Sequence, residues 1–191
     1  MKKTLLLLIL CISITVTGCR KKEEAGSVDV GGGNVQALQD TGQIEAQYKD
    51  VLAKDPRNYE ATVGLGNHYF DAGLPEKAIE MYQKALEINP NDANVRTDMG
   101  TMYRTTGNFD KAIEAFRKSA SIDPMHEQAR YNLGVTLYQD KKDLKGAADA
   151  WEELLKINPN HPNAEGLRQE ISRARNQQTP ESKSPSRGWV K

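Results

Sequence analysis

The chain has 191 residues with 26 basic and 26 acidic side chains, so it carries no formal net charge at pH 7. This balance provides no basic excess for the phosphate backbone of a nucleic acid, and no nucleic-acid partner is expected. The only two cysteines, Cys11 and Cys19, lie near the start of the chain. A fold held together by disulfides is therefore excluded for the rest of it.

The first 18 residues have the pattern of an export signal. Lys2 and Lys3 precede an apolar run over residues 5–16 that is broken only by Ser13 and Thr15. Twelve helical residues span about 18 Å, which is too short for a hydrocarbon core of about 30 Å. Residues 1–18 are therefore predicted to be a signal peptide and are left out of the fold.

The segment Val16-Thr17-Gly18-Cys19 resembles the lipobox of bacterial lipoproteins, in which small residues precede an invariant cysteine. The resemblance implies that the Cys19 sulfur takes a diacylglyceryl group, that cleavage occurs before Cys19, and that the freed amine receives a further acyl chain such as palmitate. Two chains give stable anchoring, because each buried CH₂ contributes about 0.8 kcal/mol. The alternative is a plain secretory peptide with an unrelated cysteine.

Residues 19–34 are predicted to be the lipidated cysteine and a flexible tether. Residues 20–24 are charged and residues 31–33 are glycines, so the segment would span about 20 Å on average. Arg20 follows the cysteine where an aspartate would imply retention at the inner membrane. The resemblance therefore implies an outer-membrane lipoprotein that faces the periplasm, or the outer face of the plasma membrane in an organism with one membrane.

From residue 56 onward, four residue classes recur every 34 or 35 positions. The glycines are Gly66, Gly100 and Gly134; the prolines are Pro56, Pro90, Pro124 and Pro159; the alanines are Ala78, Ala112 and Ala147; the aromatics are Tyr82, Phe116 and Trp151. Self-similarity at this period predicts stacked structural repeats.

Each repeat is predicted to be two helices, over residues 59–92, 93–126 and 127–161. Gly73 and Gly107 suit the left-handed residue that ends a first helix, and Pro75 suits the first position of a second helix. The second helices are expected to end where proline follows, since proline disfavours the α conformation before it. The third unit lacks the turn glycine and has one extra residue within 139–144, which predicts a longer loop there.

The ends of the array are predicted to be incomplete or capped. Residues 35–58 are a partial repeat: residues 44–56 align with a second helix, with Tyr48 in the aromatic place, and the first helix within 34–41 is degenerate or short. Residues 162–176 are a capping helix, because Leu167 and Ile171 share one face. Residues 177–191 are expected to be a disordered tail. A docking motif at Trp189 and Val190 is the alternative.

These repeats resemble the tetratricopeptide repeat. The first unit carries the family phrase as Leu65, Gly66, Tyr69, Ala78, Tyr82, Ala85 and Pro90. Ser119 and Leu154 replace its last alanine in the other two units, and Thr62, Arg96 and Arg130 replace the family tryptophan. The resemblance implies an all-α, right-handed superhelix of stacked helical hairpins, with about three full repeats, a partial one before them and a capping helix after.

The resemblance also implies that the first helices line a concave groove that binds partner peptides. The candidate partner-binding residues are Asn67, Phe70, Asn94, Thr97, Thr101, Arg104, Gln128, Tyr131, Asn132 and Tyr138. Their amides can donate to and accept from a peptide backbone, and tyrosines are common anchors in binding sites. The alternative for Phe70 and Tyr138 is packing beneath neighbouring helices.

Chaperone-binding members of the family hold a C-terminal carboxylate with Lys, Asn, Asn, Lys and Arg. The corresponding places here are Val63, Asn67, Asp98, Gln128 and Asn132. Asn67 alone matches and every cation is missing, so no carboxylate clamp is expected.

No catalytic, cofactor or metal site is expected. His68, His126 and His161 are never spaced to share a metal on one helix, and the glycines at 31–33 precede no phosphate-binding lysine. The expected function is a membrane-anchored envelope scaffold whose groove binds peptide segments of other envelope proteins, in assembly of an envelope, secretion or pilus complex. The alternatives are a self-associating structural lipoprotein, with its groove filled by its own tail or a second copy, and an accessory regulator of an envelope hydrolase.

Overall fold

The computed structural model describes residues 32–177, with side chains from residue 42 onward. The predicted signal peptide, Cys19, most of the tether and the tail from residue 178 lie outside the described residues. The α-helices are α1 (Gly32–Lys54), α2 (Tyr59–Asp71), α3 (Pro75–Ile88), α4 (Ala93–Thr105), α5 (Phe109–Ile122), α6 (Glu127–Val135), α7 (Leu144–Ile157) and α8 (Ala164–Asn176). A π-helical turn, η1 (Thr136–Asp140), continues α6.

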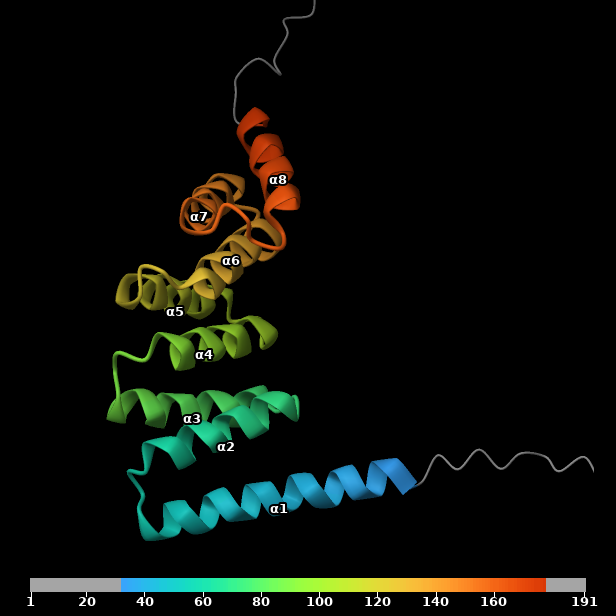
Figure 1. Cartoon of the computed structure of the whole chain (residues 1–191), viewed down its shortest axis with the longest axis vertical. Helices are drawn as coiled ribbons and strands as arrows, with labels where there is room; N and C mark the ends of the chain where they lie inside the picture. Colours follow the sequence, from blue (N-terminus) through green and yellow to red (C-terminus); the bar gives the residue numbers. More distant parts are fainter. Residues whose placement is uncertain (1–31, 178–191) are drawn as a thin grey trace, which may run out of the picture.

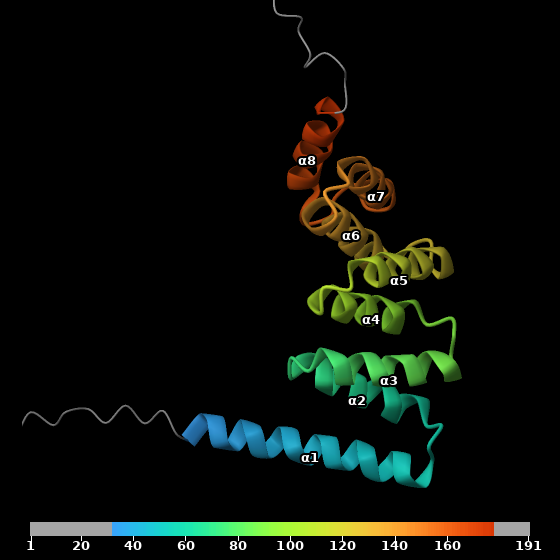
Figure 2. The same ribbon diagram turned by 180° about the vertical axis from the view of Figure 1, so that it is seen from behind.

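The helices form one stack of hairpins, α2–α3, α4–α5 and α6–α7, with α1 at one end and α8 at the other (Figures 1 and 2). The three first helices begin at Tyr59, Ala93 and Glu127, where the sequence predicts them. The all-α, repeat-stacked fold class is thereby confirmed.

Helix boundaries also recur with the period. Asn58, Asp92 and His126 each cap a first helix, with side chains that accept from the backbone N–H groups of Ala61, Val95 and Ala129. The residues that cap the C-terminal ends of the second helices are Asn89, Asp123 and Asn158, each followed by proline and each with φ between −130° and −119°. Polar caps and prolines therefore mark the same places in every unit.

The core of each hairpin is a glycine of the first helix against an aromatic ring of the second. A Cβ at Gly66 would lie 2.7 Å from the Tyr82 ring, and one at Gly100 would lie 2.7 Å from the Phe116 ring. Trp151 lies closer still to Gly134. Because these distances leave no room for a methyl group, the recurring glycines are needed for the helices to approach.

The first two turns follow the sequence prediction. Gly73 and Gly107 have φ of 66° and 74°, in the left-handed region that glycine adopts without steric cost. Pro75 is the first residue of α3, where its missing N–H leaves no hydrogen bond unmade.

The third turn differs from the prediction of a longer loop. Residues 141–143 separate η1 from α7, and residues 72–74 and 106–108 separate the helices of the other two hairpins, so the three connections are equal in length. The extra residue is accommodated in η1, where the helix widens by one residue per turn. Lys142, with φ of 57°, takes the left-handed place of the missing glycine.

The N-terminal unit also differs from the prediction of a short first helix. One continuous helix, α1, runs from Gly32 to Lys54 and begins inside the predicted tether. The physical reason is the absence of a turn: Gln39, Asp40 and Thr41 stand 34 residues before the Gly73-Leu74-Pro75 turn and include neither glycine nor proline. The helix therefore continues through this position, and its first part extends beyond the hairpins to one side (Figure 1).

The capping helix is present where the sequence predicts it. Leu167 and Ala174 of α8 are buried. Arg175 donates to Asp149 and Glu152 of α7, and the hydrogen bonds from Lys145 and Arg175 lower the pKa of the Asp149 carboxyl. The outer side of α8 is polar and closes this end of the array.

Candidate functional site

Three clefts open along the first helices. The first cleft, about 230 Å³, is lined by Asn67, Phe70, Asp71, Tyr82 and Asp98. The second cleft, about 320 Å³, is lined by Thr101, Arg104, Thr105, Gly107, Phe109 and Asp140. The third cleft, about 470 Å³, lies between α6–η1 and α8 and includes Tyr131, Val135 and Tyr138. The three clefts lie on one side of the stack, because equivalent positions of successive repeats line them: residues 67, 101 and 135, and likewise residues 70, 104 and 138. We call the three clefts together the groove.

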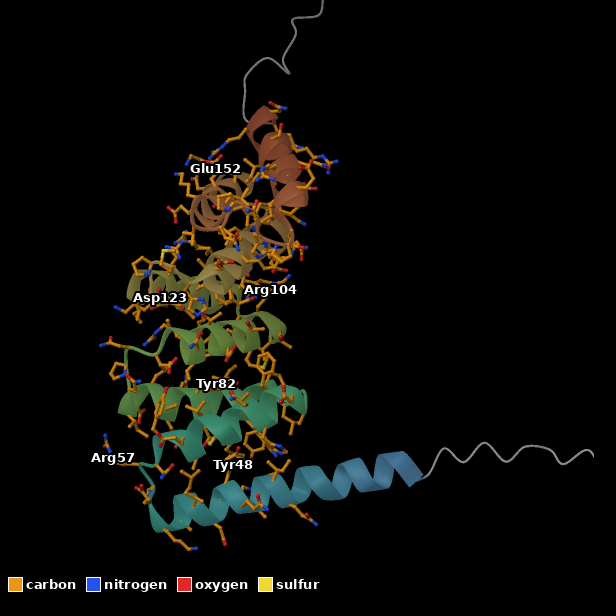
Figure 3. All side chains as sticks on the ribbon, in the orientation of Figure 1. Tyr48, Arg57, Tyr82, Arg104, Asp123 and Glu152 are labelled. Carbon is orange, nitrogen blue, oxygen red and sulfur yellow. The ribbon has the colours of Figure 1, made fainter. Side chains whose placement is uncertain are left out.

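The first cleft has a negative charge that no described residue compensates. Burial, aided by Asp92 and Asp71, raises the pKa of Asp98 to about 6. No described lysine, arginine or histidine lies within 4 Å of the carboxylates of Asp71 or Asp98. Tyr82, which is labelled in Figure 3, donates its hydroxyl to Asn67 Oδ1 at 2.8 Å. The Asn67 amide N–H groups remain available.

In the second cleft, the polar groups pair with each other. Arg104, which is labelled in Figure 3, donates from Nε to Asp140 Oδ2 at 2.5 Å and from Nη2 to Gln139 Oε1 at 2.8 Å. Both acceptors belong to η1. Asn132 Nδ2 donates to Thr101 Oγ1 at 3.3 Å across the hairpins. The charge of Arg104 is therefore neutralised within the chain.

The third cleft is lined by aromatic residues. Tyr138 donates its hydroxyl to Glu170 of α8 at 2.7 Å, and its ring centroid lies 5.5 Å from that of Trp151. This hydrogen bond raises the pKa of the Tyr138 phenol. Tyr131 stacks on His161, with ring centroids 5.6 Å apart and planes inclined by 28°.

The structure brings six of the ten predicted residues to the clefts: Asn67, Phe70, Thr101, Arg104, Tyr131 and Tyr138. Phe70 and Tyr138 are half-buried, so each packs against a neighbour and still lines a cleft. Gln128 donates to Asn132 at 2.9 Å beside the second cleft, and Asn94 is exposed at the start of α4 without lining any of the three.

The prediction for Thr97 is wrong. Its side chain is 2% exposed and donates to the Ala93 carbonyl oxygen at 2.8 Å. Its hydroxyl also lies 2.7 Å from the hydroxyl of Ser119, which replaces the family alanine. A buried hydroxyl requires polar partners, and the Ala93 carbonyl oxygen and the Ser119 hydroxyl supply them here.

The ten candidate residues leave out the acidic groups of the clefts. Asp71, Asp98, Asp140 and Glu170 all face the groove, and none is among the candidates. For Asp98 a signal existed, because it stands one period before the predicted Asn132. For Asp140 none did, because its position depends on η1.

A separate and larger hollow, about 660 Å³, lies on the other side of α4. Arg96, Lys111, Arg117 and Lys118 supply positive charge around Met99 and Tyr103. Lys111 Nζ lies 5.5 Å from the centre of the Tyr103 ring. This basic hollow was not predicted from sequence and is not part of the groove.

Within residues 32–177, no three His, Cys, Asp or Glu side chains are grouped closely enough to hold a metal ion. Among the helices of this same part of the chain, none is both long and apolar enough to cross a membrane.

Stacked helical hairpins with open clefts along their first helices define the class of helical-repeat scaffolds that bind other proteins. Two family models, both described as tetratricopeptide repeat, match residues 59–125 and 97–162. The chain belongs to the tetratricopeptide repeat family. Among curated proteins, no match was found.

Several solved structures share the fold. The crystal structure of MamA is 25% identical, with a TM-score of 0.63, and the match covers 79% of this chain and 96% of MamA. PilF of Pseudomonas aeruginosa is 21% identical, with a TM-score of 0.60 and coverage of 75% of this chain and 64% of that one. The first tetratricopeptide domain of Spaghetti (RPAP3), bound to the HSP90 peptide SRMEEVD, is 23% identical, with a TM-score of 0.56 and coverage of 62% and 95%.

Proposed function

We propose that this chain is a lipid-anchored scaffold of the bacterial cell envelope, whose groove captures extended segments of other envelope proteins during assembly of an envelope, secretion or pilus complex. The lipobox-like segment ending at Cys19 supports the anchor, and Arg20 supports an outer-membrane location where there are two membranes. The peptide named with the Spaghetti domain supports a peptide as the ligand.

The observation that carries this proposal is the negative charge of the first cleft, which no neighbouring cation balances. Two carboxylates, Asp71 and Asp98, lie beside the half-buried Phe70 ring with no cation from the described chain. An opposite charge within about 4–6 Å favours the charged form of a carboxyl group, so a bound cation would stabilise Asp98. The partner segment therefore carries a lysine or arginine that enters the first cleft.

The other two clefts extend the same surface. Gln128, Asn132 and Thr101 can exchange hydrogen bonds with a peptide backbone, and Tyr131 offers a flat anchor. Since repeat positions are in register, an extended segment can cross all three clefts. The chain acts by binding, and no reaction is assigned to it.

The groove is tested by photo-crosslinking in intact cells from a probe at Asn67, with mass spectrometric mapping of the crosslinked residue. We expect adducts within a few residues of a partner lysine or arginine. Asp71→Lys with Asp98→Lys should reduce them at least about tenfold, which corresponds to ~1.4 kcal/mol. The matched control is Glu80→Lys with Glu87→Lys on the exposed side of α3.

The variant Asp71→Asn with Asp98→Asn is a control for misfolding, because it removes the carboxylates without placing a positive charge in the cleft. It should weaken capture in the same direction while circular dichroism stays unchanged. Unchanged adducts in both cleft variants, or equal loss in the control, would contradict the groove proposal.

The anchor is tested by metabolic labelling with a fatty acid. We expect label on the wild-type chain and none on Cys19→Ala, with the variant released from the membrane fraction. A labelled Cys19→Ala chain, or an unlabelled wild-type chain, would contradict the anchor and leave the groove proposal intact.

A further inference from the structure

The basic hollow has a positive charge that no described acidic residue balances. Its charged lining residues are four cations and one anion: Arg96, Lys111, Arg117, Lys118 and Glu114. None of the four cations lies within 4 Å of a described Asp or Glu carboxylate, Glu114 included. Arg96 Nη2 donates to the Pro90 carbonyl oxygen at 2.7 Å, but Arg96 Nε is buried and has no described hydrogen-bond partner. Because a buried donor without an acceptor is costly, the hollow is short of an acidic group.

The third hairpin shows which group the chain itself places beside the equivalent arginine. Arg130 stands 34 residues after Arg96, and Glu153 stands 35 residues after Lys118, as Trp151 does after Phe116. Arg130 Nε makes no hydrogen bond either, but Glu153 Oε2 lies 3.7 Å from it. In the second hairpin, Lys118 holds the place of Glu153 and adds a positive charge. The group that the hollow lacks is therefore a carboxylate facing Arg96.

The floor of the basic hollow is apolar and preformed. Met99 and Ala115 are buried, and Tyr103 is half-buried beside them. The Tyr103 hydroxyl accepts from Gln83 of α3 at 2.8 Å, and Lys111 Nζ lies 5.5 Å from the centre of the Tyr103 ring. The ring is thus held between two neighbours and offers a flat surface to an apolar side chain.

We propose that the basic hollow binds an acidic segment of a partner protein, whose carboxylates meet Arg96 and Lys118 and whose apolar side chain lies on Tyr103. A carboxylate is the acceptor that suits a guanidinium best, because both are planar and can form two parallel hydrogen bonds. Charge complementarity of this kind also speeds the encounter and selects the partner.

The basic hollow is distinct from the groove. Arg96 lines the hollow and Asp98 lines the first cleft, and at 100° per residue the two positions are about 200° apart around α4. Helix α4 therefore presents a cationic surface on one side and an anionic surface on another. The chain can hold an acidic segment in the hollow while a basic segment occupies the groove.

Two other sources of negative charge fit the hollow less well. Residues 1–31 contain five cations and three acidic residues, and residues 178–191 contain three cations and one acidic residue, so neither end of the chain has an acidic excess. An anionic bilayer is flat, so it would meet the exposed Lys111 and Lys118 and leave the apolar floor uncovered. An acidic segment with an apolar side chain matches both the rim and the floor.

The first test is selection from a display library of random peptides on the full chain, with counter-selection against Lys118→Glu. This variant supplies at residue 118 the acid that the third hairpin has at residue 153. We expect the retained peptides to carry several Asp or Glu residues around an apolar one. Replacing those acids by Gln or Asn should weaken binding to the wild-type chain at least about tenfold in fluorescence anisotropy. A selection that retains no peptide, or peptides without acidic residues, would overturn the proposal.

The matched control is Lys84→Glu, at the equivalent place of α3, where Thr62 stands instead of the arginine. It makes the same change of charge outside the hollow, so the selected peptides should bind it as they bind the wild-type chain. Equal loss of binding in Lys84→Glu would overturn the proposal, because the hollow would then not be the site.

Melting temperature separates loss of binding from loss of folding. Lys118→Glu should raise it by about 2 °C, since the glutamate gives Arg96 the neighbour that Arg130 has. Lys118→Gln removes the charge without adding another and should weaken peptide binding about threefold. Unchanged binding in Lys118→Gln, or a lower melting temperature in Lys118→Glu, would overturn the proposal.

Two further arms distinguish the occupants. Nanodiscs of phosphatidylglycerol compete with the selected peptides, with phosphatidylcholine nanodiscs as the neutral reference, and light scattering follows the oligomeric state. Displacement by the anionic nanodiscs alone would assign the hollow to a membrane, and dimers that Lys118→Glu abolishes would assign it to a second copy; either would overturn the proposal. Crosslinks from Asn67 in the groove should be unchanged in Lys118→Glu, so the two proposals can fail independently.

Discussion

The second hairpin, α4–α5, and the third, α6–η1–α7, solve the same packing problem with different residues. In both, a glycine lies against an aromatic ring, Gly100 against Phe116 and Gly134 against Trp151. The third unit has one more residue than the second, yet the turn between its two helices has the same length, because η1 accommodates the extra residue. The comparison teaches that the period is maintained at the contacts between helices, while the residues between those contacts are free to differ.

The difference extends into the groove. In the third hairpin, Gln139 and Asp140 of η1 accept hydrogen bonds from Arg104, so the charges of Arg104 and Asp140 in the second cleft balance each other. In the second hairpin, Asp98 occupies the place that Asn132 holds in the third, and no described residue pairs with it. The first cleft is therefore the part of the groove with the most to gain from a ligand.

The largest expected effect tests the glycine contact in the two hairpins. Gly134→Ala should lower the free energy of unfolding by about 3 kcal/mol and Gly100→Ala by about 1 kcal/mol, within the range for overpacked cores. The reason is that a methyl group at Gly134 would lie closer to Trp151 than one at Gly100 would lie to Phe116. Urea unfolding measures both. Equal losses, or a gain at Gly134, would show that the third hairpin is not the tighter one.

The next effect concerns Asp98, whose counterpart in the third hairpin is Asn132. Folding raises the pKa of Asp98 from 3.8 to about 6, so the folded state binds the proton more tightly. The free energy of unfolding should therefore fall as the pH rises from about 4 to about 6 and remain low above it. Asp98→Asn should remove this fall and stabilise the chain at pH 7 by about 1–2 kcal/mol, allowing for partial exposure. Thermal unfolding against pH measures it, and an unchanged profile would contradict it.

A smaller effect tests the turns. Lys142→Gly should raise the free energy of unfolding by about 1 kcal/mol, because Lys142 holds a φ of 57° that glycine adopts without strain. Gly107→Ala should lower it by a similar amount, since alanine at a φ of 74° is strained. Denaturant midpoints of the two variants should move in opposite directions. A shift in the same direction would mean that the two turns are not equivalent.

The smallest effect is expected at Ser119, where the third hairpin has the buried Leu154. Ser119→Ala should change the free energy of unfolding by about 0.5 kcal/mol, because Thr97 keeps its hydrogen bond to the Ala93 carbonyl oxygen. A loss above about 2 kcal/mol, measured by the same unfolding experiment, would show that the paired hydroxyls are essential to the second hairpin.

The sequence predicts the fold correctly at positions where a single physical requirement selects one residue type. Residues 66, 100 and 134 must be small and residues 73 and 107 must adopt positive φ. Glycine meets both requirements, so its recurrence identifies these positions in the sequence. The third turn and α1 were predicted incorrectly, because an inserted residue can enter a loop or a helix, and a missing turn can shorten or lengthen the helix before it.

The groove was less predictable than the fold. Helical period identifies which residues share a side of a helix, and six of the ten candidates line a cleft. It does not reveal that Arg104 meets Asp140, because that pair joins two hairpins through a π-helical turn. Nor does it reveal that the Thr97 side chain is buried, with its hydroxyl bonded to the Ala93 carbonyl oxygen and in contact with Ser119.

The length of α1 has a mechanical consequence. Its 23 residues make a rod of about 34 Å, and the first part of that rod stands clear of the hairpins. If the proposed lipid anchor holds the leading end of this rod, the angle of the rod sets the tilt of all three clefts together. Because the array is long, a change of a few degrees in the angle of α1 displaces α8, at the far end, by a larger distance than it displaces α2.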